Sequence, residues 1–352
     1  MSFVSAGVQS PGTKAFIHTA YEAFQQTRQT VGLPIERYFN VAGFVVRLQF
    51  AGTELLSVIV PALVHLEVKP CQNPALTICI WDSVSTGTMM PAPLWAPEDY
   101  AARGEVRGQS DARYHTAYVR HSGLLSLIDL EQNLAIYWVR DASELPSYET
   151  SAPLRTTLNW WLSKRNCQLV HAAAVGTAEG GVLMVGKSGS GKSNTALTCL
   201  LSPLQIASDD FCIVTADETP TVYTLYNTAK THAVDLPRVP FLQHHVSNPD
   251  QLNHDKAIYF LYQSFPEKLI ASFPLRAILI PRVTGQSNTF LTQATPGAVL
   301  MALAPTTLLL LPDARSEALK AMGTITKQMP CYYLELGTET SQIPGVIASL
   351  LA

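Results

Sequence analysis

The chain has 352 residues, of which 47% are hydrophobic and 14% charged, and its formal net charge is −3. This length exceeds that of most single domains, so we expect two domains or one large elaborated domain. The near-neutral charge and the lack of a long basic run argue against a nucleic-acid partner and against binding to an anionic membrane surface. The six cysteines form no Cys-x-x-Cys pair, which argues against a zinc site.

The sequence predicts neither a membrane span nor a secretory signal. Its most apolar late stretch, residues 298–311, is interrupted by Pro305 and is too short to cross a bilayer. The first residues lack the charged and apolar regions of a signal peptide. We therefore expect a soluble, reduced protein in the cytoplasm with no membrane partner.

The first 148 residues are expected to form a smaller β-rich (α+β) domain. Residues up to about Thr13 have the composition of a loose leader, and residues 15–30 are expected to form a helix. Short runs with strand composition lie at residues 39–50, 55–60, 76–81, 113–120, 124–129 and 134–139. No chemical motif occurs among them, so we expect this domain to dock a substrate or partner.

A change in composition at residues 146–149 predicts that a second domain occupies residues 149–352. Helices are expected at 153–162, 196–201, 296–303, 317–327 and 343–351, and Pro305 is expected to end the third of these. Strands are expected at 169–176, 182–185, 206–214, 221–225, 257–260, 277–280 and 332–336. The polar segment 238–256 is a candidate mobile loop.

The sequence Gly-x-x-x-x-Gly-Lys-Ser follows the apolar run 182–185 and precedes the helix at 196–201. This strand, glycine-rich turn and helix match a phosphate-binding P-loop, whose backbone N–H groups surround a nucleotide's phosphates. The lysine of such a loop reaches the outer phosphates, and its serine can bind Mg²⁺. The candidate nucleotide-binding residues are Gly186, Lys187, Ser188, Gly189, Ser190, Gly191, Lys192, Ser193 and Asn194.

Three further polar features accompany the loop. Asp209 and Asp210 are adjacent carboxylates inside the apolar run 206–214, His171 lies on the strand before the P-loop strand, and Lys230 follows a short polar segment. Adjacent residues of a strand face opposite ways, so only one aspartate can point fully at the phosphates unless the strand kinks there. A P-loop with an aspartate at a strand end is typical of a Mg²⁺-nucleotide site.

With these residues the chain resembles the HPr kinase/phosphorylase family, and specifically its bacterial HPr-kinase-related serine kinases, including those of peptide-biosynthesis clusters. The resemblance rests on residues 170–172, 186–193 and 208–210, with a wider pattern at 152–161 and 330–337, and covers residues 150–352. It implies an α/β P-loop kinase domain of the HPr kinase type with a mixed sheet. It also implies ATP and Mg²⁺ as cofactors and makes a homo-oligomer an expectation.

The resemblance further implies a role for each site residue. Lys192 would bridge the β- and γ-phosphates, and Ser193 and Asp209 would organise Mg²⁺. Asp210 would take the proton from an attacking hydroxyl, and His171 would position that carboxylate. Lys230 is a further candidate for phosphate contact. Which aspartate is the base and which is the metal ligand stays open at this point.

The expected reaction is transfer of the γ-phosphate of ATP to a serine or other hydroxyl of a peptide or protein. The glycine-containing signature that follows the acidic pair in the true HPr enzymes is absent between Val214 and Val283, which argues against HPr itself as the acceptor. Two alternatives remain. One is a small-molecule hydroxyl kinase or carboxykinase-like enzyme, and the other is an ATP-binding regulatory or scaffold protein without phosphoryl transfer.

Overall fold

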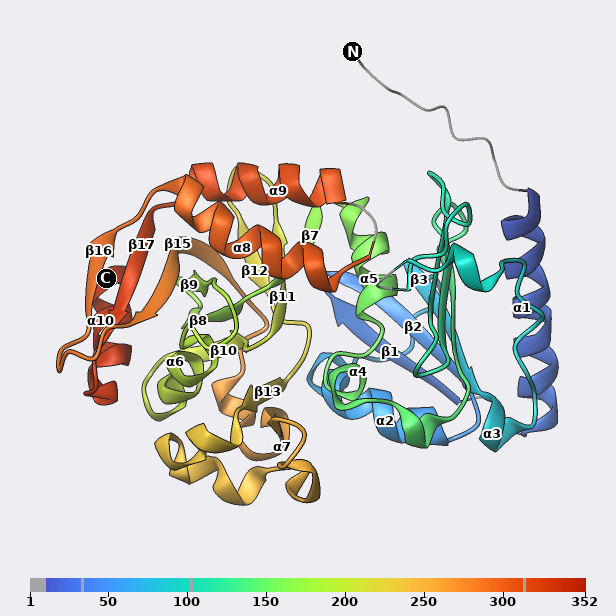
Figure 1. Cartoon of the computed structure of the whole chain (residues 1–352), viewed down its shortest axis with the longest axis horizontal. Coiled ribbons are helices and arrows are strands. Elements are labelled where there is room, and N and C mark those ends of the chain that lie inside the picture. Colours follow the sequence, from blue (N-terminus) through green and yellow to red (C-terminus); the bar gives the residue numbers. More distant parts are fainter. Residues whose placement is uncertain (1–10, 33–34, 102–103, 313–314) are drawn as a thin grey trace, which may run out of the picture. The chain divides into compact units, whose positions relative to one another are not determined.

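A computed structural model of the chain describes residues 11–32, 35–101, 104–312 and 315–352. It is a mixed α/β structure whose contacts divide it into two compact units. The first unit comprises Met1–Pro61, Glu67–Trp161 and Leu311–Asp313, and the second comprises the rest of the chain. The leader expected before Thr13 lies largely outside the described residues. Figure 1 shows the elements of each unit.

A mixed six-stranded sheet forms the centre of the first unit, in the order β1-β2-β3-β6-β5-β4. The strands β2, β3 and β6 run parallel to one another and the other pairings are antiparallel. The six strands are β1 (Ile35–Val41), β2 (Phe44–Ala51), β3 (Leu76–Asp82), β4 (Tyr114–Val119), β5 (Leu124–Asp129) and β6 (Leu134–Val139). The β-rich character expected for this part of the chain is therefore confirmed.

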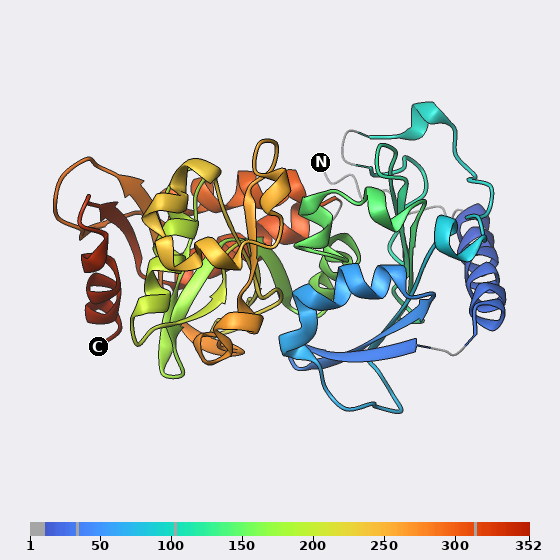
Figure 2. The same cartoon turned by 90° about the horizontal axis from the view of Figure 1, so that it is seen from below.

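Helix α1 (Pro11–Thr30) packs along this sheet (Figure 2). Phe16, Ala20 and Phe24 are buried at four-residue intervals, which is the spacing of one helix face, and they share a core with Trp81 and Trp138. The helix expected at residues 15–30 is confirmed. The unit also contains two short helices, α3 (Ser83–Thr86) and α4 (Ser147–Thr150).

The strand expected at residues 55–60 is wrong, because this segment lies in helix α2 (Glu54–Leu63). Leu55, Ile59, Ala62 and Leu63 are buried while Ser57 is exposed, so burial follows the helical period of 3.6. The run of valine and isoleucine favours a strand locally, but this burial pattern overrides that propensity.

The boundary between the units lies after Trp161 rather than after residue 148. Helix α5 (Arg155–Ser163) begins in the first unit, and its two tryptophans bond to that unit. Trp160 Nε1 donates to the Pro312 carbonyl at 3.1 Å, and Trp161 Nε1 donates to Asn133 Oδ1 at 2.9 Å. These two contacts explain why residues 149–161, assigned by composition to the second domain, belong to the first unit.

The second unit contains a mixed nine-stranded sheet with the path β10-β8-β9-β15-β12-β11-β7, to which β17 and β16 are added beside β15. Only the β9–β15 and β15–β17 pairings are parallel. The strands are β7 (Cys167–His171), β8 (Ala173–Thr177), β9 (Gly180–Met184), β10 (Gln205–Ser208), β11 (Phe211–Thr215), β12 (Thr221–Tyr223), β15 (Ser272–Val283), β16 (Phe290–Gln293) and β17 (Cys331–Leu336).

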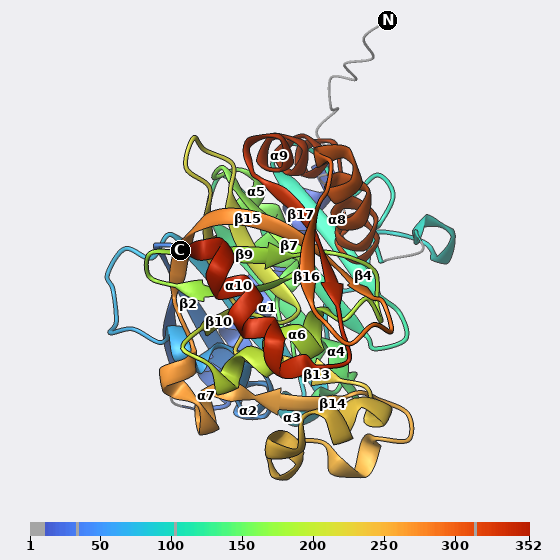
Figure 3. The same cartoon turned by 90° about the vertical axis from the view of Figure 1, so that its left-hand side faces the viewer.

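Helices cover both faces of this sheet (Figure 3). On one face, α6 (Lys192–Thr198) and α10 (Ile343–Leu351) pack against Val182 and Met184. On the other face, α8 (Pro296–Leu310) and α9 (Arg315–Gln328) pack near Leu183 and Val185. The residues of β9 thus alternate between two cores, which is why this strand is an unbroken apolar run.

Pro305 does not end a helix, contrary to the sequence-based expectation. Helix α8 continues through it to Leu310, with Pro305 itself exposed. Val299, Leu303 and Thr307 stay buried at four-residue intervals on either side of the proline, so packing against the sheet keeps the helix in register. Among the described residues, none of the helices has both the length and the hydropathy that crossing a bilayer demands.

Further elements of the second unit lie between β12 and β15 in the order of the chain. A two-stranded sheet pairs β13 (Thr228–Thr231) with β14 (Ala257–Phe260), and α7 (Leu261–Ser264) follows. The segment expected to be a loop, residues 238–256, contains short 3₁₀ helices at Pro240–His245 and Pro249–Gln251.

His65 is a partly buried histidine of the second unit, and the fold favours its neutral form. Its Nε2 atom lies 3.0 Å from Thr224 Oγ1, and burial lowers its pKa from 6.5 to about 4. Since the unfolded chain binds the proton more tightly, the free energy of unfolding should be greatest above about pH 6.5. It should fall by up to about 3 kcal/mol as the pH drops to about 4.

His65→Gln is expected to flatten that part of the pH profile, because glutamine does not titrate. Urea unfolding of the wild type and the variant between pH 4 and 7 measures the difference. His18→Gln is the matched control, since His18 is exposed. If the free energy of unfolding changed equally with pH in the wild type and in His65→Gln, the lowered pKa of His65 would be contradicted.

Candidate functional site

The loop between β9 and α6 bends through three glycines with positive φ angles. These are +149° at Gly186, +79° at Gly189 and +105° at Gly191, a region that side chains disfavour. A Cβ atom on Gly191 would also lie 2.5 Å from Leu336 Cδ1, so the loop passes too close to β17 for a larger residue. The strand, turn and helix expected around the motif are confirmed.

Lys192 starts α6 and folds back over this loop. Its Nζ atom donates to the carbonyl oxygens of Gly186 at 2.6 Å and Lys187 at 3.2 Å, and the residue is only 6% exposed. Burial lowers the pKa of this ammonium group, while Asp209 and Asp210 act in the opposite direction. Lys187, by contrast, is exposed.

The two aspartates lie at a break in the sheet, not inside a continuous strand. The segments expected as single strands at 169–176 and 206–214 are each split in two, at Ala172 and at Asp209–Asp210. Strand β7 pairs with β11, and β8 pairs with β10, so the two breaks lie side by side. Ala172 N–H donates to the Asp210 carbonyl at 2.9 Å across them. Because the strand is interrupted, both carboxylates can line the same cavity.

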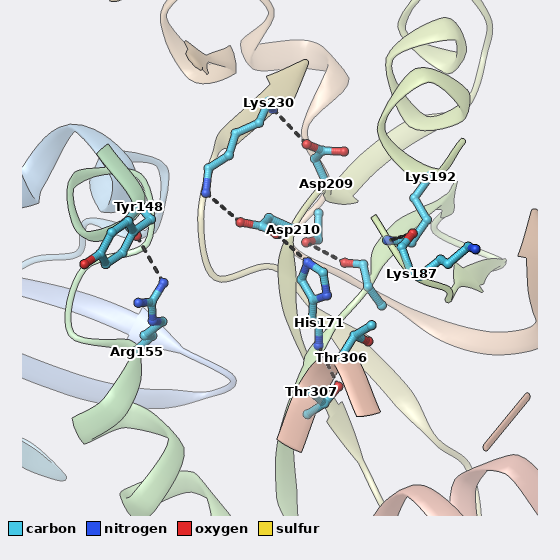
Figure 4. Close-up of polar contacts among 12 residues, drawn as sticks. Tyr148, Arg155, His171, Lys187, Lys192, Asp209, Asp210, Lys230, Thr306 and Thr307 are labelled. Atoms are coloured by element: carbon cyan, nitrogen blue, oxygen red, sulfur yellow. Dashed lines mark hydrogen bonds and ion pairs between the residues drawn. The ribbon is translucent and has the colours of Figure 1, made fainter. Parts of the chain in front are cut away.

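The Asp210 carboxylate contacts two side chains, the imidazole of His171 and the ammonium group of Lys230 (Figure 4). Its Oδ1 atom is 2.8 Å from His171 Nε2, and its Oδ2 atom is 2.7 Å from Lys230 Nζ. Burial alone would raise the pKa of Asp210, but Lys230 and His171 outweigh it and hold the pKa well below the usual range of a carboxyl group. Asp210 is therefore ionised at neutral pH.

Asp209 has the opposite electrostatic character. Its Oδ2 atom accepts the Lys230 backbone N–H at 2.8 Å, while its buried Oδ1 atom has no hydrogen-bond partner. Burial and the charge of Asp210 raise the pKa of Asp209, and the Lys230 backbone N–H, the Ser193 hydroxyl and Lys192 counter this only in part. A buried carboxylate oxygen without a partner, close to a serine hydroxyl, is a donor set that suits a hard divalent cation.

One cavity of about 120 Å³ joins these groups. Most of the candidate residues line it, whereas Gly186, Lys187 and Ser190 belong to the loop behind it. The predicted residues in the lining are His171, Ser188, Gly189, Gly191, Lys192, Ser193, Asn194, Asp209, Asp210 and Lys230. We refer to it below as the phosphate cavity.

Six further residues of the phosphate cavity were missed by sequence reasoning, and two of them are Thr231 of β13 and Val283 of β15. His232, Asp235, Arg238 and Lys256 come from the segment that follows β13, and Arg238 donates to Asp235 at 2.8 Å. Only Arg238 and Lys256 lie in the segment expected to be a mobile loop, residues 238–256, and no motif distinguishes any of these residues from ordinary solvated ones. Arg238 and Lys256 add positive charge to the cavity that Lys230 also lines, and Asp235 offsets part of it.

Comparison with known proteins assigns no family. Neither a protein-family model nor a curated protein sequence matches the chain. Among solved structures, the Hpr(Ser) kinase/phosphatase from Coxiella burnetii is similar at 11% identity and a TM-score of 0.30, over 52% of this chain and 93% of that one. This is a weak structural similarity to a kinase, and at that TM-score it supports no conclusion about the chain.

Proposed function

We propose that the protein is an ATP- and Mg²⁺-dependent kinase that transfers the γ-phosphate to a serine, or another hydroxyl, of a peptide or protein. One observation supports this most strongly. A single cavity joins the P-loop lysine, a carboxylate oxygen without a partner on Asp209, and an ionised Asp210 held between His171 and Lys230.

The loop supplies the phosphate-binding part of the mechanism. Its glycines let backbone N–H groups point inward, where they would surround the phosphates of ATP. Lys192 Nζ now bonds to the loop carbonyls and is buried, so it is placed to exchange those contacts for the oxygens of the outer phosphates.

Ser193 and Asp209 would hold the metal ion. When bound, Mg²⁺ would neutralise charge on the β- and γ-phosphates during transfer. The Asp209 Oδ1 atom supports this assignment because it is buried and lacks a partner, and because burial and the charge of Asp210 raise the pKa of the residue, so that a bound cation would stabilise its charged form.

Asp210 would act at the acceptor hydroxyl. Its low pKa makes it a weak base, but in a loose phosphoryl-transfer transition state the hydroxyl loses its proton late, when it has become acidic. A carboxylate with two partners retains lone pairs for a third hydrogen bond, so it can orient the hydroxyl and then accept the proton. His171 and Lys230 fix its orientation. The base is thus Asp210, and Asp209 is the metal ligand.

The experiment combines the protein with Mg²⁺-ATP and the peptides encoded by neighbouring genes, followed by intact-mass analysis. The expected result is a mass gain of one phosphoryl group on a serine-containing peptide. ATP binding without transfer to any hydroxyl acceptor would instead favour the regulatory or scaffold alternative.

A small-molecule acceptor is the second candidate, and the cations in the phosphate cavity favour it. Arg238 and Lys256 lie in the same lining as Lys230 and suit an anionic metabolite. The same assay with a panel of small hydroxy acids in place of peptides separates the two candidates. Transfer to a metabolite but to no peptide would select this one.

Asp209→Asn is expected to abolish the effect of Mg²⁺ on ATP affinity without destabilising the free protein. Since burial and Asp210 raise the pKa of Asp209, its charge opposes folding at neutral pH, and an amide should increase stability by about 1 kcal/mol. Calorimetric titration with ATP, with and without Mg²⁺, and thermal unfolding measure both effects. The exposed Asp217→Asn is the control, and a variant that keeps the wild-type Mg²⁺ response would contradict the metal assignment.

A further inference from the structure

Three basic residues of the phosphate cavity come from one short ladder, the pair of strands β13 and β14. Lys230 lies on β13, His232 directly follows β13, and Lys256 directly precedes β14. Thr231 pairs with Ala257, so one step further along the ladder His232 and Lys256 are opposite each other. Alternate residues of a strand share a face, as do residues paired across a ladder. The three basic residues therefore lie on one face, which we call the basic face.

Lys256 is the cation of this cavity whose charge is not yet engaged. Lys230 and Arg238 are each paired with an aspartate, and Lys192 donates to carbonyl oxygens of the P-loop. Within the described part of the chain, the ammonium group of Lys256 has no such partner. Burial and, to a smaller degree, the charge of Lys256 lower the pKa of Lys192, so the two ammonium groups repel each other. An anion bound beside Lys256 relieves this repulsion.

The basic face adjoins the place where the acceptor hydroxyl is expected. Lys230 Nζ contacts Asp210, the group that we propose acts at this hydroxyl (Figure 4). Lys230 pairs with Ile258, so Lys256 occupies the diagonal position on the ladder. Diagonal positions are about 7–8 Å apart. A part of the acceptor that lies this far from its hydroxyl can therefore reach Lys256.

The nucleotide needs no further cation from this face. In the proposed mechanism Lys192 and the loop amides bind the phosphates, and Ser193 and Asp209 hold the metal ion. Lys256 belongs to a different element and has no role in these contacts. An anionic group of the acceptor is the remaining partner that the cavity can offer it.

We propose that the acceptor carries a carboxylate close to the hydroxyl that is phosphorylated, and that Lys256 binds this carboxylate with His232 beside it. This inference rests on the proposed kinase function and names the class of acceptor. Side chains two residues apart in an extended peptide lie on the same side, about 6.5 Å apart. That separation is close to the diagonal spacing of the ladder, so an aspartate or glutamate within two residues of a serine fits. A small hydroxy acid has the same chemistry.

The test uses synthetic nonapeptides with a single serine and a single glutamate, placed one or two residues before or after the serine. Matched peptides carry glutamine in place of the glutamate. Initial rates of phosphate transfer from Mg²⁺-ATP give kcat/KM for each peptide. The best glutamate peptide should exceed its glutamine counterpart by about tenfold, which is the effect of one charge-assisted hydrogen bond.

A parallel pair of acceptors, a three-carbon hydroxy acid and its amide, separates the two sources of the carboxylate. A preference for the acid in this pair, without transfer to any peptide, would keep Lys256 as the carboxylate-binding residue and assign the carboxylate to a metabolite. A preference among the peptides assigns it to an acidic side chain.

Variants of Lys256 test whether this residue is the source of the preference. Lys256→Gln should bring the ratio of the two kcat/KM values close to one. Lys256→Arg should keep the preference, because a guanidinium group also pairs with a carboxylate. Lys327→Gln is the matched control, since Lys327 is an exposed lysine of α9 outside the cavity lining.

Two further results would overturn the inference. One is a ratio close to one in the wild type at every glutamate position and in the hydroxy-acid pair. The other is weaker ATP binding by Lys256→Gln with an unchanged ratio, which would place Lys256 at the nucleotide's phosphates. In both cases the protein still transfers phosphate, so the proposed function survives. If no hydroxyl acceptor of any kind is phosphorylated, both proposals fail.

Discussion

Replacing Lys192 with alanine is expected to lower the rate of phosphoryl transfer by about a hundred- to a thousandfold and to weaken ATP binding. The side chain is buried against the loop, and no other cation of the loop reaches the same position, since Lys187 is exposed. The magnitude follows from the removal of one preorganised charge from the site of a developing negative charge. Steady-state kinetics with the identified acceptor measure the rate, and calorimetry measures the affinity.

Lys187→Ala is the matched control for Lys192→Ala. Both residues are lysines of the same loop, but Lys187 contributes only its backbone carbonyl to the contacts of Lys192 Nζ. We expect transfer by Lys187→Ala within about threefold of the wild type, as for most exposed substitutions. Equal losses in both variants would mean that the loop's overall charge, and not the position of Lys192, determines the rate.

The strand, glycine-rich turn and helix at residues 180–198 could be predicted from the sequence because their requirements are local. Three glycines, a lysine and a serine within eight residues specify a turn that few other conformations satisfy, and the flanking apolar runs specify a strand and a helix. The positive φ angles at Gly186, Gly189 and Gly191 agree with that expectation.

The acid pair was only partly predictable. The sequence shows that Asp209 and Asp210 are adjacent. It does not show the break between β10 and β11, because the residues that contact this break are distant along the chain. The break is matched by the one at Ala172, and Ser208 Oγ donates to the Ala172 carbonyl at 3.2 Å. This hydrogen bond joins residues 36 positions apart, so the local sequence around the two aspartates does not predict the break in the strand.

The sequence identifies Lys230 as a candidate for phosphate contact, but it does not predict the contact of Lys230 with Asp210. Lys230 lies on β13, which pairs only with β14 among the described strands, and its side chain returns to Asp210 across 20 residues of sequence. The cations Arg238 and Lys256 reach the same cavity from 3₁₀ turns and loops that lack periodicity. No pattern of apolar residues encodes that placement.

Two predictions for the first unit were wrong because contacts between distant residues overrode the local composition. Valine and isoleucine in residues 55–60 favour a strand by composition, and only the burial of Leu55, Ile59 and Ala62 shows a helix. Likewise, the composition break at residues 146–149 is real, but the bonds of Trp160 and Trp161 assign the following helix to the first unit. Local propensity identified many elements and failed where packing reversed it.

Asp210→Asn is expected to lower phosphoryl transfer by about a hundred- to ten-thousandfold while ATP affinity changes by less than about threefold. The amide keeps the size of the side chain and one acceptor oxygen for Lys230, but it cannot take up the proton of the acceptor hydroxyl. Because the pKa of Asp210 is held low in the folded state, its charge stabilises the protein above about pH 4 and less so at lower pH. The variant should lose this acid-dependent change in stability, which pH-dependent unfolding measures.

Asp235→Asn supplies the control, because Asp235 lines the same cavity and is also ion-paired, in its case with Arg238. A loss of transfer confined to Asp210→Asn, with ATP still bound, separates a role in proton transfer from a general effect of charge in the cavity. It also separates the kinase from the scaffold alternative, since a protein that only binds ATP needs no group at the acceptor hydroxyl. Full activity of Asp210→Asn, in the assay and in cells, would contradict the kinase mechanism, because no other carboxylate in the cavity is held between His171 and Lys230.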